Sequence, residues 1–149
     1  MDLSFRVIGS HEDTKMSGQD ELERLARIAV NCGFQIHKEL GPGLLESAYE
    51  ALMEAALRQE GLAVRRQVPI TMRYNGVLVE NAFKIDILVE DRLVIELKSI
   101  ERLAAVHAKQ VLTYLRLMQL PLGLPMNFGQ AIFKDGLKRV ANDYYGPIR

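Results

Sequence analysis

The sequence predicts an α/β fold in which helices flank a mixed sheet. Two segments with helical periodicity come first, alternating strands joined by short turns follow, and a further helical segment leads into a short apolar strand. Helices on a partly parallel sheet bury the faces that such a sheet would otherwise expose to water. The order of these elements therefore indicates the fold class before any single residue is considered.

Composition limits the kind of protein. The chain has 149 residues and zero formal net charge, so it lacks the overall basic charge typical of nucleic-acid binders, and positive charge for such a partner must be local. Its one cysteine, Cys32, excludes an intramolecular disulfide or a cysteine cluster, which favours a reducing cytoplasm. No stretch approaches the ~18 apolar residues of a membrane span, and we expect no membrane association.

The first part of the chain divides into a tail and a helix. Residues 1–20 are polar and aperiodic and predict a disordered tail, so the single domain is expected over residues 21–149. Apolar positions three and four apart predict a helix over residues 21–40, which Gly41-Pro42-Gly43 ends. His37 near its end is more readily explained as a solvated or dipole-paired histidine than as a catalytic one.

A second helix and two strands follow. Residues 44–60 have helical periodicity and carry Glu46 in the first turn, where an acid is common for dipole reasons alone. Residues 62–74 read as a strand that contains Pro69, which predicts an edge strand or a bulge. Asn75-Gly76 predicts a tight hairpin into a partner strand that bends near residues 80–81.

Two alternating apolar runs, KIDILV and LVIELK, form the centre of the chain. If Val89 faces Leu93 across the polar turn between them, Asp86 lies opposite Glu96, and Lys98 shares a face with Glu96. Opposed carboxylates repel each other, so a sheet that keeps them is suited to hold a cation. By itself, the pattern is equally typical of a half-solvated sheet face.

The last part of the chain predicts a helix, a strand and a hairpin. Residues 104–118 are helical, and Gln110 and Tyr114 lie four apart on one face. Residues 122–128 predict a buried strand, parallel to LVIELK through a right-handed crossover. Asp135-Gly136, between AIFK and LKRV, predicts a C-terminal hairpin.

This ordered set of residues resembles the PD-(D/E)XK nuclease superfamily, and the Gln-x-x-x-Tyr of the third helix resembles the motif of its RecB-type branch. The chain more closely resembles the GxxExxY protein family, whose name matches Gly43, Glu46 and Tyr49. The matching words are IHKELGPGLLESAYE, RQVPI, KIDILVED, VIELKSI, VHAKQVLTYL, GLPMNFG and KDGLKRV. The resemblance covers about residues 21–140 and implies a restriction-endonuclease-like αβββαβ core, here with an extra N-terminal helix and the C-terminal hairpin.

The resemblance also implies a divalent-metal site for Mg²⁺ or Mn²⁺. The implied ligands are Asp86, Glu96, the Leu97 carbonyl and Glu46. Lys98 would orient or activate the attacking water, and Gln110 and Tyr114 would line the site from the third helix. Lys84-Ile85, Ser99-Ile100 and Pro125 depart from the family's usual residues; none is an implied ligand, so the departures bear on local shape only.

The function expected from the resemblance is metal-dependent hydrolysis of phosphodiester bonds, in DNA rather than RNA. Local positive charge predicts the nucleic-acid contacts, at Arg66, Arg73, Lys138 and Arg139. The alternative is a non-catalytic nucleic-acid-binding or interaction module with the same fold. A structural protein is a third reading, and a homodimer or a recruiting protein partner fits all three. The complete acid–acid–Lys set favours the enzyme.

Overall fold

The computed structural model describes residues 17–142, and within that range the elements follow the predicted order. The helices are α1 (Gly18–Leu40), α2 (Glu46–Gln59) and α3 (Ala105–Met118), with the 3₁₀ helix η2 (Phe133–Gly136). The strands are β1 (Val64–Tyr74), β2 (Val77–Val89), β3 (Leu93–Lys98), β4 (Leu122–Asn127) and β5 (Val140–Ala141).

Helix α1 begins earlier than the sequence predicts. The Ser17 side chain accepts a hydrogen bond from the Asp20 backbone N–H at 3.0 Å, which satisfies one of the donors left free at a helix start. Residues 18–20 of the predicted tail therefore belong to α1. Residues 1–16 of that tail lie outside the described residues, as do residues 143–149.

Within residues 17–142 the strands form one mixed sheet in the order β1-β2-β3-β4-β5. β3 and β4 are parallel, and the other neighbouring pairs are antiparallel. Helix α3 connects β3 to β4, so the predicted parallel pair joined through a helix is confirmed. β1 lies at the edge of the sheet, which agrees with Pro69 in its sequence, since proline cannot donate to a neighbouring strand.

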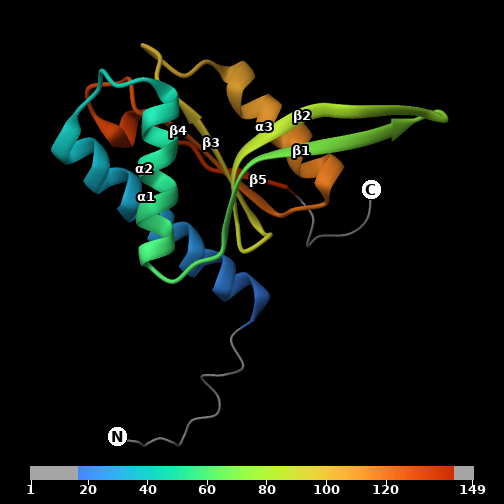
Figure 1. Ribbon diagram of the computed structural model, residues 1–149, viewed down its shortest axis with the longest axis horizontal. Coiled ribbons are helices and arrows are strands. Elements are labelled where there is room, and N and C mark those ends of the chain that lie inside the picture. Colours follow the sequence, from blue (N-terminus) through green and yellow to red (C-terminus); the bar gives the residue numbers. More distant parts are fainter. Residues whose placement is uncertain (1–16, 143–149) are drawn as a thin grey trace, which may run out of the picture.

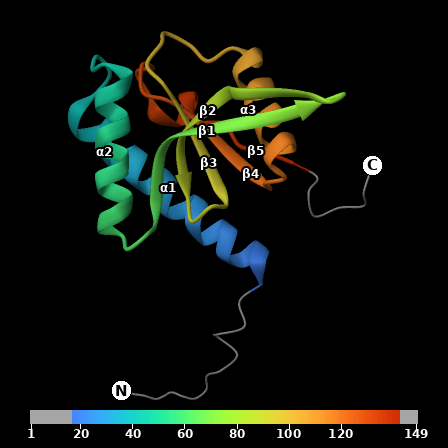
Figure 2. The same ribbon diagram turned by 45° about the vertical axis from the view of Figure 1, so that its right-hand side comes forward.

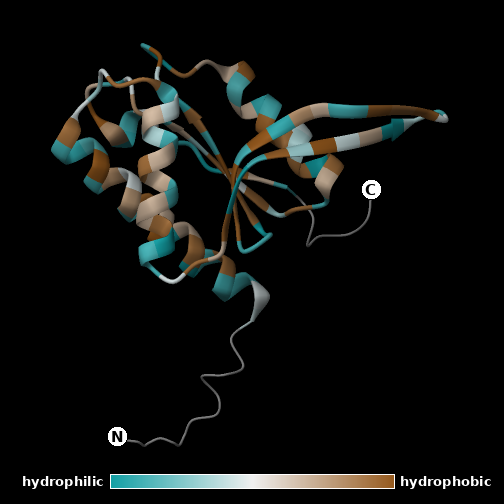
Figure 3. Cartoon of the chain, viewed as in Figure 1, coloured by the Kyte–Doolittle hydropathy of each residue, from teal (hydrophilic) through white to brown (hydrophobic). Residues whose placement is uncertain are grey.

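Helices cover both faces of the sheet. Helices α1 and α2 lie together on one face and α3 lies on the other, as Figures 1 and 2 show. Two apolar cores correspond to these faces: one holds the buried residues of α1 and α2, and the other holds Val111, Tyr114 and Leu115 of α3. Figure 3 shows the centre of the sheet, between the helices, as mainly hydrophobic. No helix in the described range has the length and apolar character needed to cross a membrane.

The β1–β2 hairpin extends past the rest of the sheet (Figure 1). Asn75 and Gly76 at its tip have φ values of 49° and 79°, as the predicted tight turn requires. The register shifts after Ile70, and Asn81 has φ 55°, so the predicted bend is present. Apolar side chains of the outer part are exposed, among them Tyr74 at 69%.

The predicted C-terminal hairpin is wrong. The segment forms η2 instead, and the two-residue strand β5 pairs with β4. Phe133 explains the difference, because its ring is buried against Phe128 and His37, with centroid separations of 5.4 and 5.8 Å. Burying an aromatic ring under α1 stabilises the 3₁₀ turn, and a hairpin would move that ring away from the core.

Candidate metal centre

The side chains of β2 change from one face of the sheet to the other at Asp86. Ile85 packs in the core beneath α3, whereas Ile87 packs in the core beneath α1 and α2. Residues two apart share a face in a regular strand, so the backbone rotates at Asp86. The ladder between β2 and β3 also ends at the pair Ile87–Ile95, one residue short of Asp86 and Glu96. The two strands therefore separate at the predicted acids.

The separation frees a backbone donor for Asp86. The Leu97 N–H donates to Asp86 Oδ2 at 2.8 Å, which fixes the carboxylate against β3. Leu97 itself is buried in the core beneath α1 and α2, so Glu96 and Lys98 point toward the other face by strand alternation. The structure thus brings Asp86, Glu96 and Lys98 together at one opening of the sheet.

Glu96 is the most perturbed acid of this group. Its side chain is only 7% exposed, and burial, followed by repulsion from Asp86, raises its pKa from 4.5 to about 8. Burial also raises the pKa of Asp86, and repulsion from Glu50 and Glu46 adds to that shift. Attraction to Lys98 lowers both pKa values without offsetting the rise.

One carboxylate oxygen at this opening lacks a partner. Glu96 Oε1 is buried and accepts no hydrogen bond from the described part of the chain. A buried acceptor without a partner costs about 1–3 kcal/mol, and a bound cation would remove that cost. The oxygen donors of Asp86 and Glu96 are the type that Mg²⁺ and Mn²⁺ prefer. These residues therefore fit a hard divalent cation.

The fit rests on two carboxylates rather than on a complete shell of acids. Among residues 17–142, no three His, Cys, Asp or Glu side chains gather closely enough to hold a metal ion. Mg²⁺ commonly keeps several water ligands, so two protein carboxylates are a sufficient anchor. Further ligands would come from water, from substrate oxygens or from the predicted Leu97 carbonyl.

Glu46 is the first residue of α2. It is exposed, yet its charge contributes to the raised pKa values of Asp86 and Glu96, so it lies near both. Tyr49, one turn later, is fully buried and stacks on Phe128 with ring centroids 4.5 Å apart. Its hydroxyl donates to the Gly41 carbonyl and accepts from the Leu44 N–H at 3.2 Å. Tyr49 thereby holds the loop that sets where Glu46 begins the helix.

The structure adds an acid that sequence reasoning missed. Glu50, one turn after Glu46, is buried, and its carboxylate accepts from Arg66 Nη2 at 3.0 Å and from Gln67 Nε2 at 2.6 Å. The same Gln67 nitrogen lies 3.3 Å from Asp86 Oδ1. The spacing of four between Glu46 and Glu50 places them on one helix face, and this was the available signal.

Tyr114 and Gln110, the two residues predicted to line the site from α3, differ in exposure. Tyr114 is buried and stacks on Phe83 at 4.1 Å, and burial, then the charges of Glu96 and Asp86, raise its pKa. Gln110 is exposed and lines a cavity of about 510 Å³ beside Lys98. His107 and Lys109 line the same cavity, and sequence reasoning did not select them.

The four basic residues predicted to contact nucleic acid lie in three different places. Arg66 pairs with Glu50 and Glu54, both at 3.0 Å, beside the acids. Arg73 is exposed on the outer part of β1. Lys138 and Arg139 lie beside α1, where Arg139 pairs with Glu23. Their role in binding stays a prediction.

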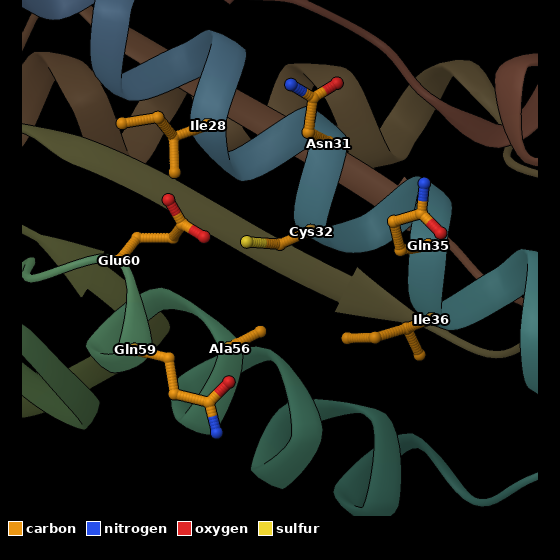
Figure 4. Close-up of a pocket in the computed structure, with 8 residues that line it drawn as sticks. All are labelled: Ile28, Asn31, Cys32, Gln35, Ile36, Ala56, Gln59 and Glu60. Atoms are coloured by element: carbon orange, nitrogen blue, oxygen red, sulfur yellow. The ribbon is translucent and has the colours of Figure 1, made fainter.

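Two other residues considered from sequence lie apart from the acids. His37 is buried, not solvated, and its Nε2 lies 2.7 Å from the Gln130 carbonyl oxygen. Cys32 faces a groove of about 290 Å³ between α1 and α2 (Figure 4). Burial and Glu60 raise the pKa of the Cys32 thiol, which therefore stays protonated and unreactive at neutral pH. None of the predicted site residues lines this groove.

The fold and the site together define a class of protein: a helix-flanked mixed sheet with an acid on each of two separating strands and a lysine after the second acid. The chain belongs to the PD-(D/E)XK nuclease superfamily, whose family model matches residues 23–140. No curated protein and no solved structure matches the chain. The predicted superfamily and the restriction-endonuclease-like fold are confirmed, and membership indicates a metal-dependent, nucleic-acid-directed hydrolase.

Proposed function

We propose that this protein is a divalent-metal-dependent nuclease that hydrolyses phosphodiester bonds of DNA. The observation that carries the proposal is the buried, unpartnered oxygen of Glu96 beside Asp86 and Lys98. Buried carboxylate oxygens normally have a hydrogen-bond partner, so an orphaned one beside a second acid points to a ligand-binding site. The superfamily supplies the reaction class, and the geometry supplies the residues.

Within the superfamily, we infer membership of the GxxExxY family and its RecB-type relatives. The support is positional: Glu46 begins α2 after the loop that contains Gly43, and Tyr49 holds that loop. Gln110 and Tyr114 lie on α3, which covers the face toward which Glu96 points. These positions support the two motif assignments.

The chain's own residues would divide the work as follows. Asp86 and Glu96 would hold the cation, the Leu97 carbonyl and water would supply further ligands, and Glu46 would contribute through water from the start of α2. A bound Mg²⁺ or Mn²⁺ would supply Lewis-acid activation of water and of the phosphate. Glu96 must release its proton for this role, because a protonated acid is a poor ligand. Lys98 places a fixed positive charge where negative charge develops. Gln110 lines the cavity next to Lys98 and is available to orient the substrate.

The same cavity suggests a path for the nucleic-acid backbone. Lys98 and Lys109 line it together, so a phosphate entering it meets two positive charges next to the acids. Arg66 is engaged by Glu50 and Glu54 and would have to leave them to contact a phosphate. Arg73, Lys138 and Arg139 would serve only a substrate that wraps around the domain. Cytoplasmic location remains part of the proposal and rests on the cysteine content.

The non-catalytic module is the second candidate. Its support is that Arg66 and Gln67 already occupy the carboxylate of Glu50, which leaves this acid unavailable to a metal ion. A homodimer or a recruiting partner is compatible with either function, and the exposed apolar side chains of the outer β1–β2 hairpin are the support for it. The two functions differ in whether the wild-type protein cleaves nucleic acid.

A cleavage assay separates them. Single- and double-stranded DNA and RNA are incubated with the protein and Mg²⁺ or Mn²⁺, and products are resolved on denaturing gels. We expect cleavage of DNA that falls at least about 100-fold in Glu96→Gln and in Lys98→Ala, since each removes a group acting at the reacting phosphate. Glu80→Gln, at an exposed site on β2, is the matched control and should retain wild-type activity. Undiminished cleavage in both site variants, or no cleavage by the wild type, would contradict the proposal.

A further inference from the structure

Gln67 on β1 lies opposite Asp86 on the neighbouring strand β2. The registered pairs Arg66–Ile87 and Val68–Ile85 flank the two residues on either side. Gln67 has φ 50°, which is uncommon for a residue other than glycine and is unusual inside a strand. Val64 and Val68 pack in opposite cores as a result, so β1 rotates at the same level as β2. The positive φ of Gln67 therefore occurs inside a strand, next to the acids, and not in a turn.

The Gln67 amide occupies the space between two carboxylates. Its Nε2 donates to Glu50 Oε2 at 2.6 Å and lies 3.3 Å from Asp86 Oδ1, so one nitrogen bridges an acid on α2 and an acid on β2. An amide nitrogen carries two N–H donors, which matches one donor to each oxygen. A point that faces two carboxylate oxygens is also where a hard cation is attracted most strongly.

Neighbouring groups keep Glu50 in this arrangement. Arg66 Nη2 donates to the other Glu50 oxygen at 3.0 Å, and Arg66 Nη1 donates to Glu54 at 3.0 Å. Glu50 is buried, so its charge needs these donors to remain in place. The Leu97 N–H likewise holds the second oxygen of Asp86. Gln67 is thus the group that a cation could displace from between the two acids, and it is exposed to solvent.

We propose that Gln67 is a positioning residue that sets the cation affinity of this site: its amide bridges Glu50 and Asp86 in the cation-free protein and competes with the cation for their oxygens. The inference rests on the proposed metal-dependent function. It adds Glu50 as an acid that becomes available to the cation when the amide is removed. Arg66 and Gln67 then limit how tightly the wild-type protein binds the metal.

Two substitutions at this exposed position test the proposal. Gln67→Glu keeps the size of the side chain but replaces the amide with a carboxylate, the third beside Glu50 and Asp86, so cation-free stability should fall and Mn²⁺ affinity should rise at least about ten-fold. Gln67→Ala removes the donors without adding charge, so its Mn²⁺ affinity should lie between those of the wild type and Gln67→Glu. Gln35→Glu adds the same charge on α1, outside the site, and should change neither quantity.

The measurements are calorimetric titration of the full chain with Mn²⁺ and urea unfolding in the presence of a chelator. Mn²⁺ binding that tightens from wild type to Gln67→Ala to Gln67→Glu supports the inference. Mn²⁺ binding that appears only in the Gln67 variants also supports it, but would overturn the function proposed for the wild type. Wild-type binding that Gln67→Glu leaves unchanged or weakens overturns the inference and leaves the function standing. Absence of binding in every variant overturns both. Unchanged cation-free stability in Gln67→Glu also contradicts the bridge.

Discussion

Among single residues, Glu96 is the one whose chemistry folding changes most. The sequence places a carboxyl group there, but the burial of its side chain and the neighbouring Asp86 make it an acid with a pKa of about 8. At neutral pH and without a cation, the folded protein therefore keeps this proton. Cation binding should release it, which couples metal affinity to pH.

The proton on Glu96 predicts a pH dependence of stability. The unfolded chain loses this proton near pH 4.5 and the folded chain near pH 8, so between these values the folded state binds more protons. The free energy of unfolding should then decrease as pH rises through this window, by ~3–5 kcal/mol for full titration. Asp86, whose pKa is also raised, adds to the decrease.

Urea unfolding at several pH values between 4.5 and 8.5, in a chelator, measures this effect. Glu96→Gln cannot ionise, and its stability should decline much less over the same window. A wild-type curve parallel to that of Glu96→Gln would show that Glu96 ionises at an ordinary pH and that our account of its burial is wrong.

At the scale of elements, the loop before α2 decides where Glu46 is presented. Tyr49 is on the buried side of α2, and its hydroxyl bonds to both ends of the loop, at Gly41 and Leu44. Ser99, just after β3, donates to the Leu44 carbonyl at 2.9 Å and ties the same loop to the strand that carries Glu96. Tyr49 and Ser99 therefore set the position of Glu46 through contacts with the backbone of this loop.

Tyr49→Phe tests this role of the hydroxyl. The ring keeps its stacking on Phe128, but the Gly41 carbonyl and the Leu44 N–H lose their partner in a partly buried setting, which should cost about 1–3 kcal/mol of unfolding free energy. Tyr74→Phe is the matched control, because Tyr74 is largely exposed, and its cost should be within about 0.5 kcal/mol. Equal stability of the two variants in thermal or urea unfolding would be evidence against the hydroxyl as the anchor of the loop.

Asn127 is fully buried at the end of β4. Its side chain donates to the Ile100 carbonyl and accepts from the Ile100 and Gly129 N–H groups, all within 3.0 Å. These bonds fix the chain directly after Lys98. The sequence shows an ordinary Asn near the end of an apolar strand, and nothing in its spacing indicates this contact, because Ile100 is 27 residues away.

For the whole molecule, the proposed cation site exists only in the folded chain, because β2 and β3 must lie side by side for Asp86 and Glu96 to meet. A divalent metal should therefore raise the melting temperature, with a stabilisation of about 2.7 kcal/mol when the free metal is 100 times its dissociation constant. Scanning calorimetry with millimolar Mg²⁺ or Mn²⁺ measures the shift, and K⁺ at equal ionic strength is the control. An identical melting temperature in all three would contradict the site.

Much of the architecture follows from local pattern. The three helices, the Asn75-Gly76 turn, the edge position of β1 and the parallel β3–β4 pair were all predicted. Periodicity and turn residues act locally, and a helix between two strands of one sheet favours a parallel pair. The C-terminal hairpin was not, because the choice there depended on whether the Phe133 ring could reach the core beneath α1.

The sequence by itself determined which chemical groups are present: an acid on a helix, an acid on each of two strands, and a lysine on the second. Only the tertiary structure decided how they meet. The rotation of β1 and β2 at Gln67 and Asp86, the recruitment of Glu50 and the burial of Glu96 all depend on contacts between distant parts of the chain. Alternation along a strand assigns faces only while the strand is regular, and the site forms where that regularity ends.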